Sequence, residues 1–116
     1  MQMIIAIIRP VKLDSVKEAL EKIGVERMTV CDAMGYGRQR GQTMMYRNNE
    51  YETNLLRKIA LEIVVNDDFL ERTVDTIIQV ARTGSEGIIG DGKIFVLPLQ
   101  ETISLTDSSR GPAAVN

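Results

Sequence analysis

The hydrophobic residues of this chain follow two spacings, one typical of buried strands and one typical of amphipathic helices. Residues 3–8 form a short β-branched run that ends at Arg9 and Pro10, and residues 13–23 then place apolar side chains at helical intervals before Gly24. Residues 28–33 predict a second strand. After Lys58 the large apolar residues recur at every second position, which predicts a third strand with one buried face. The residues of that face are Ile59, Leu61, Ile63 and Val65.

The second half of the chain continues with a helix and a further strand. Asp68 and Glu71 match a capping box, which predicts that a helix begins there. Residues 94–97 follow as a fourth strand that ends at Pro98. The apolar face of the intervening helix consists of Leu70, Val74, Ile77, Ile78 and Ala81.

This order of elements predicts an α+β, ferredoxin-like βαββαβ fold with a four-stranded antiparallel sheet. Helices would cover one face of that sheet. On the other face, Ala60 and Val64 alternate with the core residues and lie beside Lys58 and Glu62. A partly apolar face without a cover indicates self-association.

Two segments lack the periodicity of strands and helices. Residues 35–54 form a polar stretch that is long for so small a protein, and such loops are usually functional. Residues 106–116 are polar and small, which predicts a flexible tail.

The composition narrows the classes of function. A length of 116 residues predicts one domain, and a formal net charge of −2 argues against a nucleic-acid-binding protein. The chain has no histidine and one cysteine, Cys31, which argues against transition-metal sites and against histidine-based nucleophilic catalysis. The apolar run at residues 3–8 is too short to span a membrane, so we expect a cytoplasmic protein.

Two glycine-rich segments contain the candidate chemistry. Residues 35–41 and 83–93 each combine an open backbone with a cation, an arrangement that suits an anion such as a nucleotide phosphate. Residues 87–93 fit most of a Walker A pattern, but Ile94 replaces the required serine or threonine, and the segment leads from helix into strand. We therefore reject a P-loop.

The order and spacing of these segments resemble the PII signal-transduction proteins along nearly the whole chain. The matching segments are residues 7–10, 28–30, 35–41, 46–47, 50–51, 62–65, 81–84 and 90–95. The resemblance implies a single PII-like domain over residues 1–116, with a T-loop at about 37–55 and a B-loop at about 82–92. It also implies a homotrimeric regulator rather than an enzyme.

Family members bind ATP or ADP between subunits, and many bind 2-oxoglutarate beside Mg-ATP. The T-loop then engages targets of nitrogen metabolism, including ammonium channels and metabolic enzymes or their regulators. Such a protein is cytoplasmic and is recruited to a membrane transporter in some cases. For this chain the resemblance implies small-molecule effectors, no nucleic acid and no transition metal.

Carried over by position, the resemblance implies three groups of site residues. The nucleotide-binding positions are Thr29, Gly35, Gly37, Arg38, Glu62, Val64, Gly90, Asp91, Gly92 and Lys93. The positions implied for 2-oxoglutarate are Gln39, which would also reach magnesium through Mg-ATP, and Lys58. Tyr51 matches the T-loop tyrosine that some bacteria uridylylate.

Two departures from the family pattern bear on the ligand. Residues 85–89 make the B-loop about three residues longer than usual, which could reposition Lys93, and Glu86 adds a negative charge. Where the family usually has Arg-x-Arg near its C-terminus, this chain has Ser104 and Thr106, with Arg110 as the nearest substitute.

Three functions follow from these observations. The first is a PII-type sensor whose nucleotide and metabolite state sets the T-loop, favoured by Gln39, Lys58 and Tyr51. The second is a divergent module that senses ADP, AMP or another small anion for transport or carbon metabolism, favoured by the missing arginines. The third is a small ferredoxin-like enzyme, which the lack of histidine and of paired carboxylates disfavours.

Overall fold

The computed structural model describes residues 1–36 and 55–115. The strands are β1 (Gln2–Ile8), β2 (Thr29–Tyr36), β3 (Leu55–Val65) and β4 (Gly92–Pro98), and the α-helices are α1 (Leu13–Lys22) and α2 (Leu70–Ala81). Short 3₁₀ helices occupy Pro10–Lys12, Asp67–Phe69 and Gly111–Ala114. Among the described residues no helix is long and apolar enough to cross a membrane.

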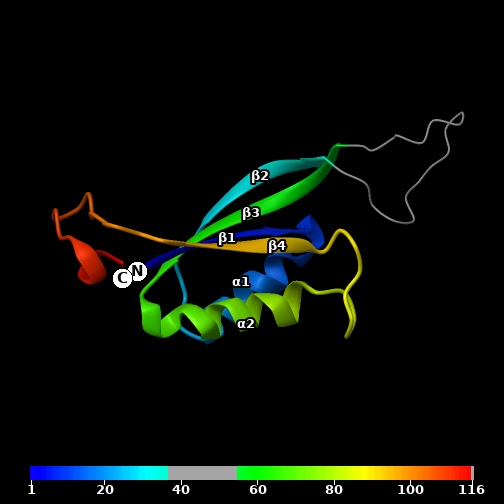
Figure 1. Ribbon diagram of the computed structural model, residues 1–116, viewed down its shortest axis with the longest axis horizontal. Coiled ribbons are helices and arrows are strands. Elements are labelled where there is room, and N and C mark those ends of the chain that lie inside the picture. The colour runs from blue at the N-terminus through cyan, green and yellow to red at the C-terminus, as the bar shows by residue number, and fades with distance from the viewer. Residues whose placement is uncertain (37–54, 116) are drawn as a thin grey trace, which may run out of the picture.

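The four strands form one antiparallel sheet in the order β2-β3-β1-β4. Helices α1 and α2 lie together on one face of the sheet, and the β2–β3 ribbon extends beyond them (Figure 1). This architecture confirms the predicted α+β, ferredoxin-like fold.

The core lies between the sheet and the helices, as the period-two and helical patterns predict. In the register of β1 and β3, Ile4 lies opposite Ile63 and Ala6 opposite Leu61, and all four side chains have no exposed surface. Burying an isoleucine or leucine side chain contributes about 1.5–3 kcal/mol, so Ile4, Leu61 and Ile63 each add to the stability of the sheet. From the helices, the core receives Val16, Leu20, Ile77 and Ala81.

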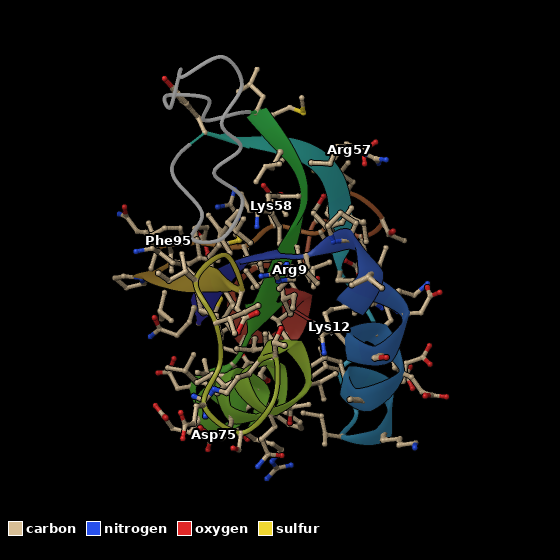
Figure 2. The ribbon with its side chains drawn as sticks, turned by 90° about the vertical axis from the view of Figure 1, so that its right-hand side faces the viewer. Arg9, Lys12, Arg57, Lys58, Asp75 and Phe95 are labelled. Carbon is tan, nitrogen blue, oxygen red and sulfur yellow. The ribbon has the colours of Figure 1, made fainter. Side chains whose placement is uncertain are left out.

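The opposite face of the sheet has no helix over it in the described chain. The register places Phe95 opposite Ile5 and Leu97 opposite Met3 on this face, and Phe95 is 49% exposed. Figure 2 shows Phe95 projecting away from the helices. We call this surface, with Ala60 and Val64, the open face.

Several details differ from the sequence-based expectations, among them the start of β4 at Gly92 rather than at residue 94. Strand β3 begins at Leu55 rather than near Lys58, and β2 continues to Tyr36, because the two backbones keep pairing where side-chain alternation has ended. The predicted capping box is wrong, since no side chain caps α2 and a 3₁₀ turn precedes it.

The C-terminal segment also contains structure that the sequence did not indicate. An isolated bridge joins Ile103 to Arg110, and the 3₁₀ helix Gly111–Ala114 follows. The guanidinium of Arg110 contacts the carboxylate of Glu101 at 3.1 Å across this hairpin.

Candidate ligand-binding site

The loop between α2 and β4, residues 82–91 and hereafter the B-loop, is organised around the carboxylate of Asp91. One oxygen accepts hydrogen bonds from the Thr83 hydroxyl at 2.6 Å and from Arg9 Nε at 3.1 Å. The other accepts from the backbone N–H groups of Thr83 at 3.0 Å and of Ile88 at 2.9 Å. Three of these bonds tie Thr83 and Ile88 of the loop to Asp91 at its end, and the fourth ties Asp91 to Arg9, directly after β1.

Two cations, one directly after β1 and one within β3, hold the same loop from the side of the sheet. Besides its ion pair with Asp91, Arg9 donates through Nη2 to the carbonyl oxygen of Ile89 at 3.2 Å. Lys58 Nζ donates to the carbonyl oxygen of Gly90 at 2.7 Å. Figure 2 shows Arg9 and Lys58 at the end of the sheet that carries this loop. Three consecutive residues of the B-loop are therefore bound to the sheet.

These contacts shift the pKa values of both charged partners. Burial, together with the nearby positive charge of Arg9, lowers the pKa of Lys58, and the negative charge of Asp91 opposes this shift only in part. Burial tends to raise the pKa of Asp91, but the hydrogen bonds from Thr83, Ile88 and Arg9 outweigh it and hold that pKa well below its usual range. Asp91 is therefore ionised at neutral pH.

Glycine is required at one position of this arrangement and favoured at a second. A Cβ atom on Gly92 would lie 1.8 Å from the carbonyl oxygen of Ile7, and the residue has φ of +124°. A Cβ atom on Gly35 would lie 3.2 Å from Cγ of Lys58, so this glycine leaves room for the lysine side chain. The glycines thus permit close packing as well as an open backbone.

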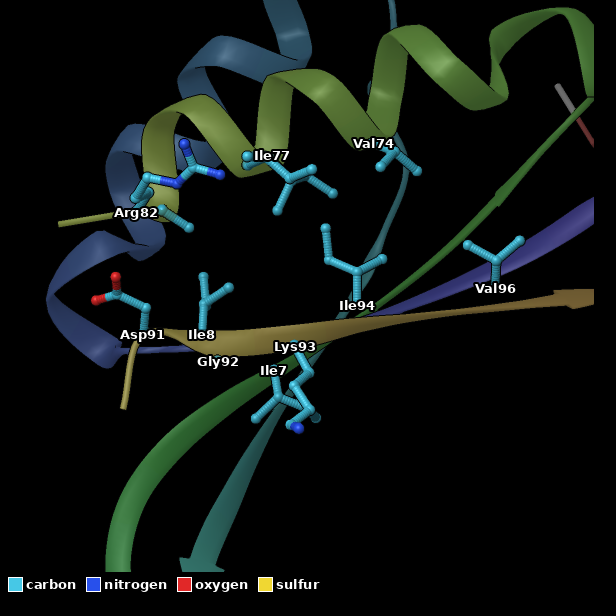
Figure 3. Close-up of a pocket in the computed structure, with 12 residues that line it drawn as sticks. Ile7, Ile8, Val74, Ile77, Arg82, Asp91, Gly92, Lys93, Ile94 and Val96 are labelled. Carbon is cyan, nitrogen blue, oxygen red and sulfur yellow. The ribbon is translucent and has the colours of Figure 1, made fainter. Parts of the chain in front are cut away.

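A cavity of 380 Å³ lies beside the B-loop, between α2 and the edge strand β4. Figure 3 shows Val74, Ile77, Ile94 and Val96 along its length, with Arg82 and Asp91 at the end near the loop. In the same figure, the side chain of Lys93 projects from the opposite side of the sheet.

The structure brings some of the predicted site residues together and separates others. Lys58, Gly90 and Asp91 meet at the B-loop, whereas Thr29 and Glu62 lie opposite each other four residues further along β3 from Lys58. At about 3.3 Å per residue this is roughly 13 Å along the strand. Val64 follows Glu62 on the same face. Gly37, Arg38, Gln39 and Tyr51 lie outside the described residues.

The lengthened B-loop is accommodated without separating Gly90 from the sheet. Gly87 donates its N–H to the carbonyl oxygen of Thr83, and Asp91 donates to that of Ile88, so the extra residues form turns between the two ends. Glu86 is exposed to solvent.

Sequence reasoning missed the roles of Arg9 and Thr83 in this site. In the sequence Arg9 marks the end of the first strand and Thr83 belongs to a glycine-rich segment; both lie in segments that resemble the PII family, but neither was expected to take part in the site. The feature that could have indicated the role of Arg9 is its place directly after a buried strand, because a cation there must either pair with an acceptor or reach solvent. In the part of the chain that the structure describes, no cluster of three acidic, cysteine or histidine side chains is placed to hold a metal ion.

Comparison with known proteins identifies the family. The sequence model described as Nitrogen regulatory protein P-II matches residues 1–108. Over 115 residues, which is 99% of this chain, it is 50% identical to Nitrogen regulatory protein GlnK1 of Methanosarcina mazei, of which 97% is covered. Over the same length it is 47% identical to Nitrogen regulatory protein P-II 1 of Escherichia coli K12 and 45% identical to Nitrogen regulatory protein P-II of Azospirillum brasilense, each covered completely.

The fold and these relatives define a small regulatory protein rather than an enzyme. The chain belongs to the nitrogen regulatory protein P-II family.

Proposed function

We propose that this chain is a PII-type sensor that binds adenine nucleotides between subunits and 2-oxoglutarate beside Mg-ATP, and that it acts on nitrogen-metabolism targets through its T-loop. The observation that supports this most is the contact between Lys58 and Gly90, which places a cation directly against a glycine-rich loop. A fixed backbone with an adjacent ammonium group is suited to anionic ligands. Family membership adds the regulatory role.

The proposed site combines described and undescribed residues. In this proposal Gly90, Gly92 and Lys93 surround the phosphates, and Lys58 receives the carboxylate of 2-oxoglutarate. Thr29, Glu62 and Val64 line the nucleotide base, and Gly35 contributes backbone to the nucleotide cradle. Gly37, Arg38 and Gln39 complete the site from the segment outside the described residues.

A homotrimer is part of the same proposal, and the open face supports it. Phe95 and Leu97 are 49% and 44% exposed there, next to the partly buried β1 residues Ile5 and Met3. Apolar side chains gathered on a sheet face without a helix require a cover. We expect Phe95→Glu to reduce the trimer to monomers in light scattering, whereas Val11→Glu, at an 80% exposed position outside that face, should leave it intact. A stable monomer or dimer of the unaltered protein would contradict the proposal.

A second candidate is a sensor of ADP, AMP or another small anion that serves transport or carbon metabolism. Ser104 and Thr106 replace two cations at the C-terminal hairpin, and the nearest arginine, Arg110, is already paired with Glu101. Each phosphate group added to a ligand needs donors, so fewer cations favour the shorter nucleotides.

Isothermal calorimetry with ATP, ADP, AMP and 2-oxoglutarate, each with and without magnesium, separates the two candidates. The first expects 2-oxoglutarate to bind only when Mg-ATP is present. The second expects ADP or AMP to bind and 2-oxoglutarate to give no signal under any condition. Absence of heat with every nucleotide would exclude both.

The proposed partners are an ammonium channel or metabolic and regulatory proteins, which the T-loop would contact from the cytoplasm. Tyr51 is the proposed position for covalent modification of that loop. Co-purification with target proteins from cells grown with and without ammonium, using the intact chain and Tyr51→Phe, tests both points.

A further inference from the structure

The hydrogen bonds of Asp91 leave its carboxylate no room for a ligand. An ionised carboxylate has about four lone-pair sites on its two oxygens. Four donors occupy them here, two from Thr83, one from Ile88 and one from Arg9. All four belong to the B-loop or to the end of β1. A nucleotide hydroxyl or a magnesium ion could bind Asp91 only by displacing one of them.

Arg9 uses two different nitrogens on two different residues of the loop. Nε contacts Asp91, and Nη2 contacts the carbonyl oxygen of Ile89. The ion pair is partly shielded from solvent, with the side chains of Arg9 and Asp91 25% and 17% exposed. Lysine has a single ammonium group and cannot reproduce the rigid fork of a guanidinium.

We infer that Arg9 and Asp91 act as a positioning pair, which holds the B-loop in place for the phosphates without touching the ligand. The pair fixes Ile89 and Asp91 on either side of Gly90, and it thereby places the Gly90 carbonyl against Lys58. This assignment rests on the proposed nucleotide function and changes the role of Asp91 within it, from a ligand contact to a support of the loop.

The experiment compares Arg9→Gln, Arg9→Lys, Asp91→Asn and the double variant Arg9→Gln/Asp91→Asn. Arg57→Gln is the matched control, because Arg57 also pairs with an aspartate, Asp32 at 3.3 Å, but both side chains are largely exposed. Two quantities are measured: the affinity for ADP and ATP by calorimetry, and amide hydrogen exchange of the ligand-free protein.

A positioning pair predicts a specific pattern of affinities. Arg9→Gln and Asp91→Asn should each weaken nucleotide binding at least tenfold, and the double variant should be no weaker than the worse single variant. Arg9→Lys should restore part of the loss, since an ammonium can reach one of the two loop acceptors. Arg57→Gln should bind as the unaltered protein does.

The exchange measurement separates positioning from general stability. In Arg9→Gln and Asp91→Asn the N–H groups of Thr83 and Ile88 should exchange faster, because they lose or loosen their acceptor. The N–H groups in the centre of β1 and β3 should keep their protection. Faster exchange throughout the sheet would mean a merely structural role and would overturn the inference.

The remaining outcomes are also decisive. If the unaltered protein binds nucleotide and folded Arg9→Gln binds it equally well, the pair does not position the loop. Additive losses in the double variant would indicate two independent ligand contacts. If the unaltered protein binds no nucleotide, the proposed function fails, and the exchange at Thr83 and Ile88 then decides the positioning role alone. If Arg9→Gln does not fold, Arg9→Lys and Asp91→Asn give the same test.

Discussion

The ammonium group of Lys58 lies 2.7 Å from the carbonyl oxygen of Gly90, so strand β3 and the B-loop share a hydrogen bond across 32 residues of sequence. The bond is partly buried, and the positive charge of Arg9 lies close enough to lower the pKa of the lysine further. Any anion that binds Lys58 therefore also acts on the position of Gly90.

Replacing this lysine tests its proposed role in binding 2-oxoglutarate. A hydrogen bond to a charged group contributes about 1.5–3 kcal/mol, and 1.4 kcal/mol corresponds to about tenfold in affinity. Lys58→Ala should therefore weaken 2-oxoglutarate binding in the presence of Mg-ATP at least about tenfold, as measured by calorimetry. Lys17→Ala, which removes an exposed lysine of α1, is the control. Unchanged affinity in Lys58→Ala would remove this residue from the site.

Substituting Gly92 tests the close approach of β4 to β1. Alanine there would place Cβ 1.8 Å from the Ile7 carbonyl oxygen in a backbone conformation with φ of +124°. Strain and overpacking together should lower the free energy of unfolding by at least about 3 kcal/mol. Gly84 also has a positive φ, +69°, but a Cβ atom there would meet no atom within 4 Å. Gly84→Ala should therefore lower the free energy of unfolding by only about 1–2 kcal/mol. Denaturant unfolding at one protein concentration compares them, and equal losses would contradict the clash.

The lowered pKa of Asp91 predicts how its contribution to stability depends on pH. A carboxyl group with a depressed pKa in the folded state stabilises the protein above its ordinary value of 3.8, and this stabilisation is lost as the pH falls below that value. Asp91→Asn should lower the free energy of unfolding by about 1–3 kcal/mol at neutral pH, because the backbone N–H groups of Thr83 and Ile88 then face a neutral amide instead of a carboxylate. The difference in unfolding free energy between the two proteins should shrink as the pH falls from 4 towards 2, about the range set by that shift. A constant difference over that range would show that ionisation is irrelevant.

Restoring cations at the C-terminal hairpin tests the preference for short nucleotides. The unaltered protein should bind ADP or AMP at least as tightly as ATP, because Ser104 and Thr106 offer no charge to the third phosphate. Ser104→Arg/Thr106→Arg should raise ATP affinity more than ADP affinity. Ser104→Lys/Thr106→Lys is the matched control, since it adds the same charge without bidentate geometry and should recover less. Clearly tighter binding of ATP than of ADP by the unaltered protein would defeat this explanation.

The sequence determined the kinds of element and most of the buried face of β3, but not the whole core side of α2, where the polar Thr73 is fully buried. Alternation from Ile59 to Val65 marks one face of β3 because successive side chains of a strand point to opposite faces, and the structure buries that face. The helical spacing of Ile77 and Ala81 likewise identifies the core side of α2. The bounds of β2 and β3 near residues 36 and 55 could not be read in this way, because backbone pairing continues there without alternation.

Only the tertiary structure decided how the charged groups of the site meet. Ile8 lies opposite Ile59 on one neighbouring strand and opposite Gly92 on the other, so the residues beside them, Arg9, Lys58 and Asp91, come to one corner of the sheet. A period of two fixes the face on which a side chain lies, but it does not fix which residues of two strands stand opposite each other. That register depends on the packing of the whole core, and it turns three separate charges of the sequence into one connected site.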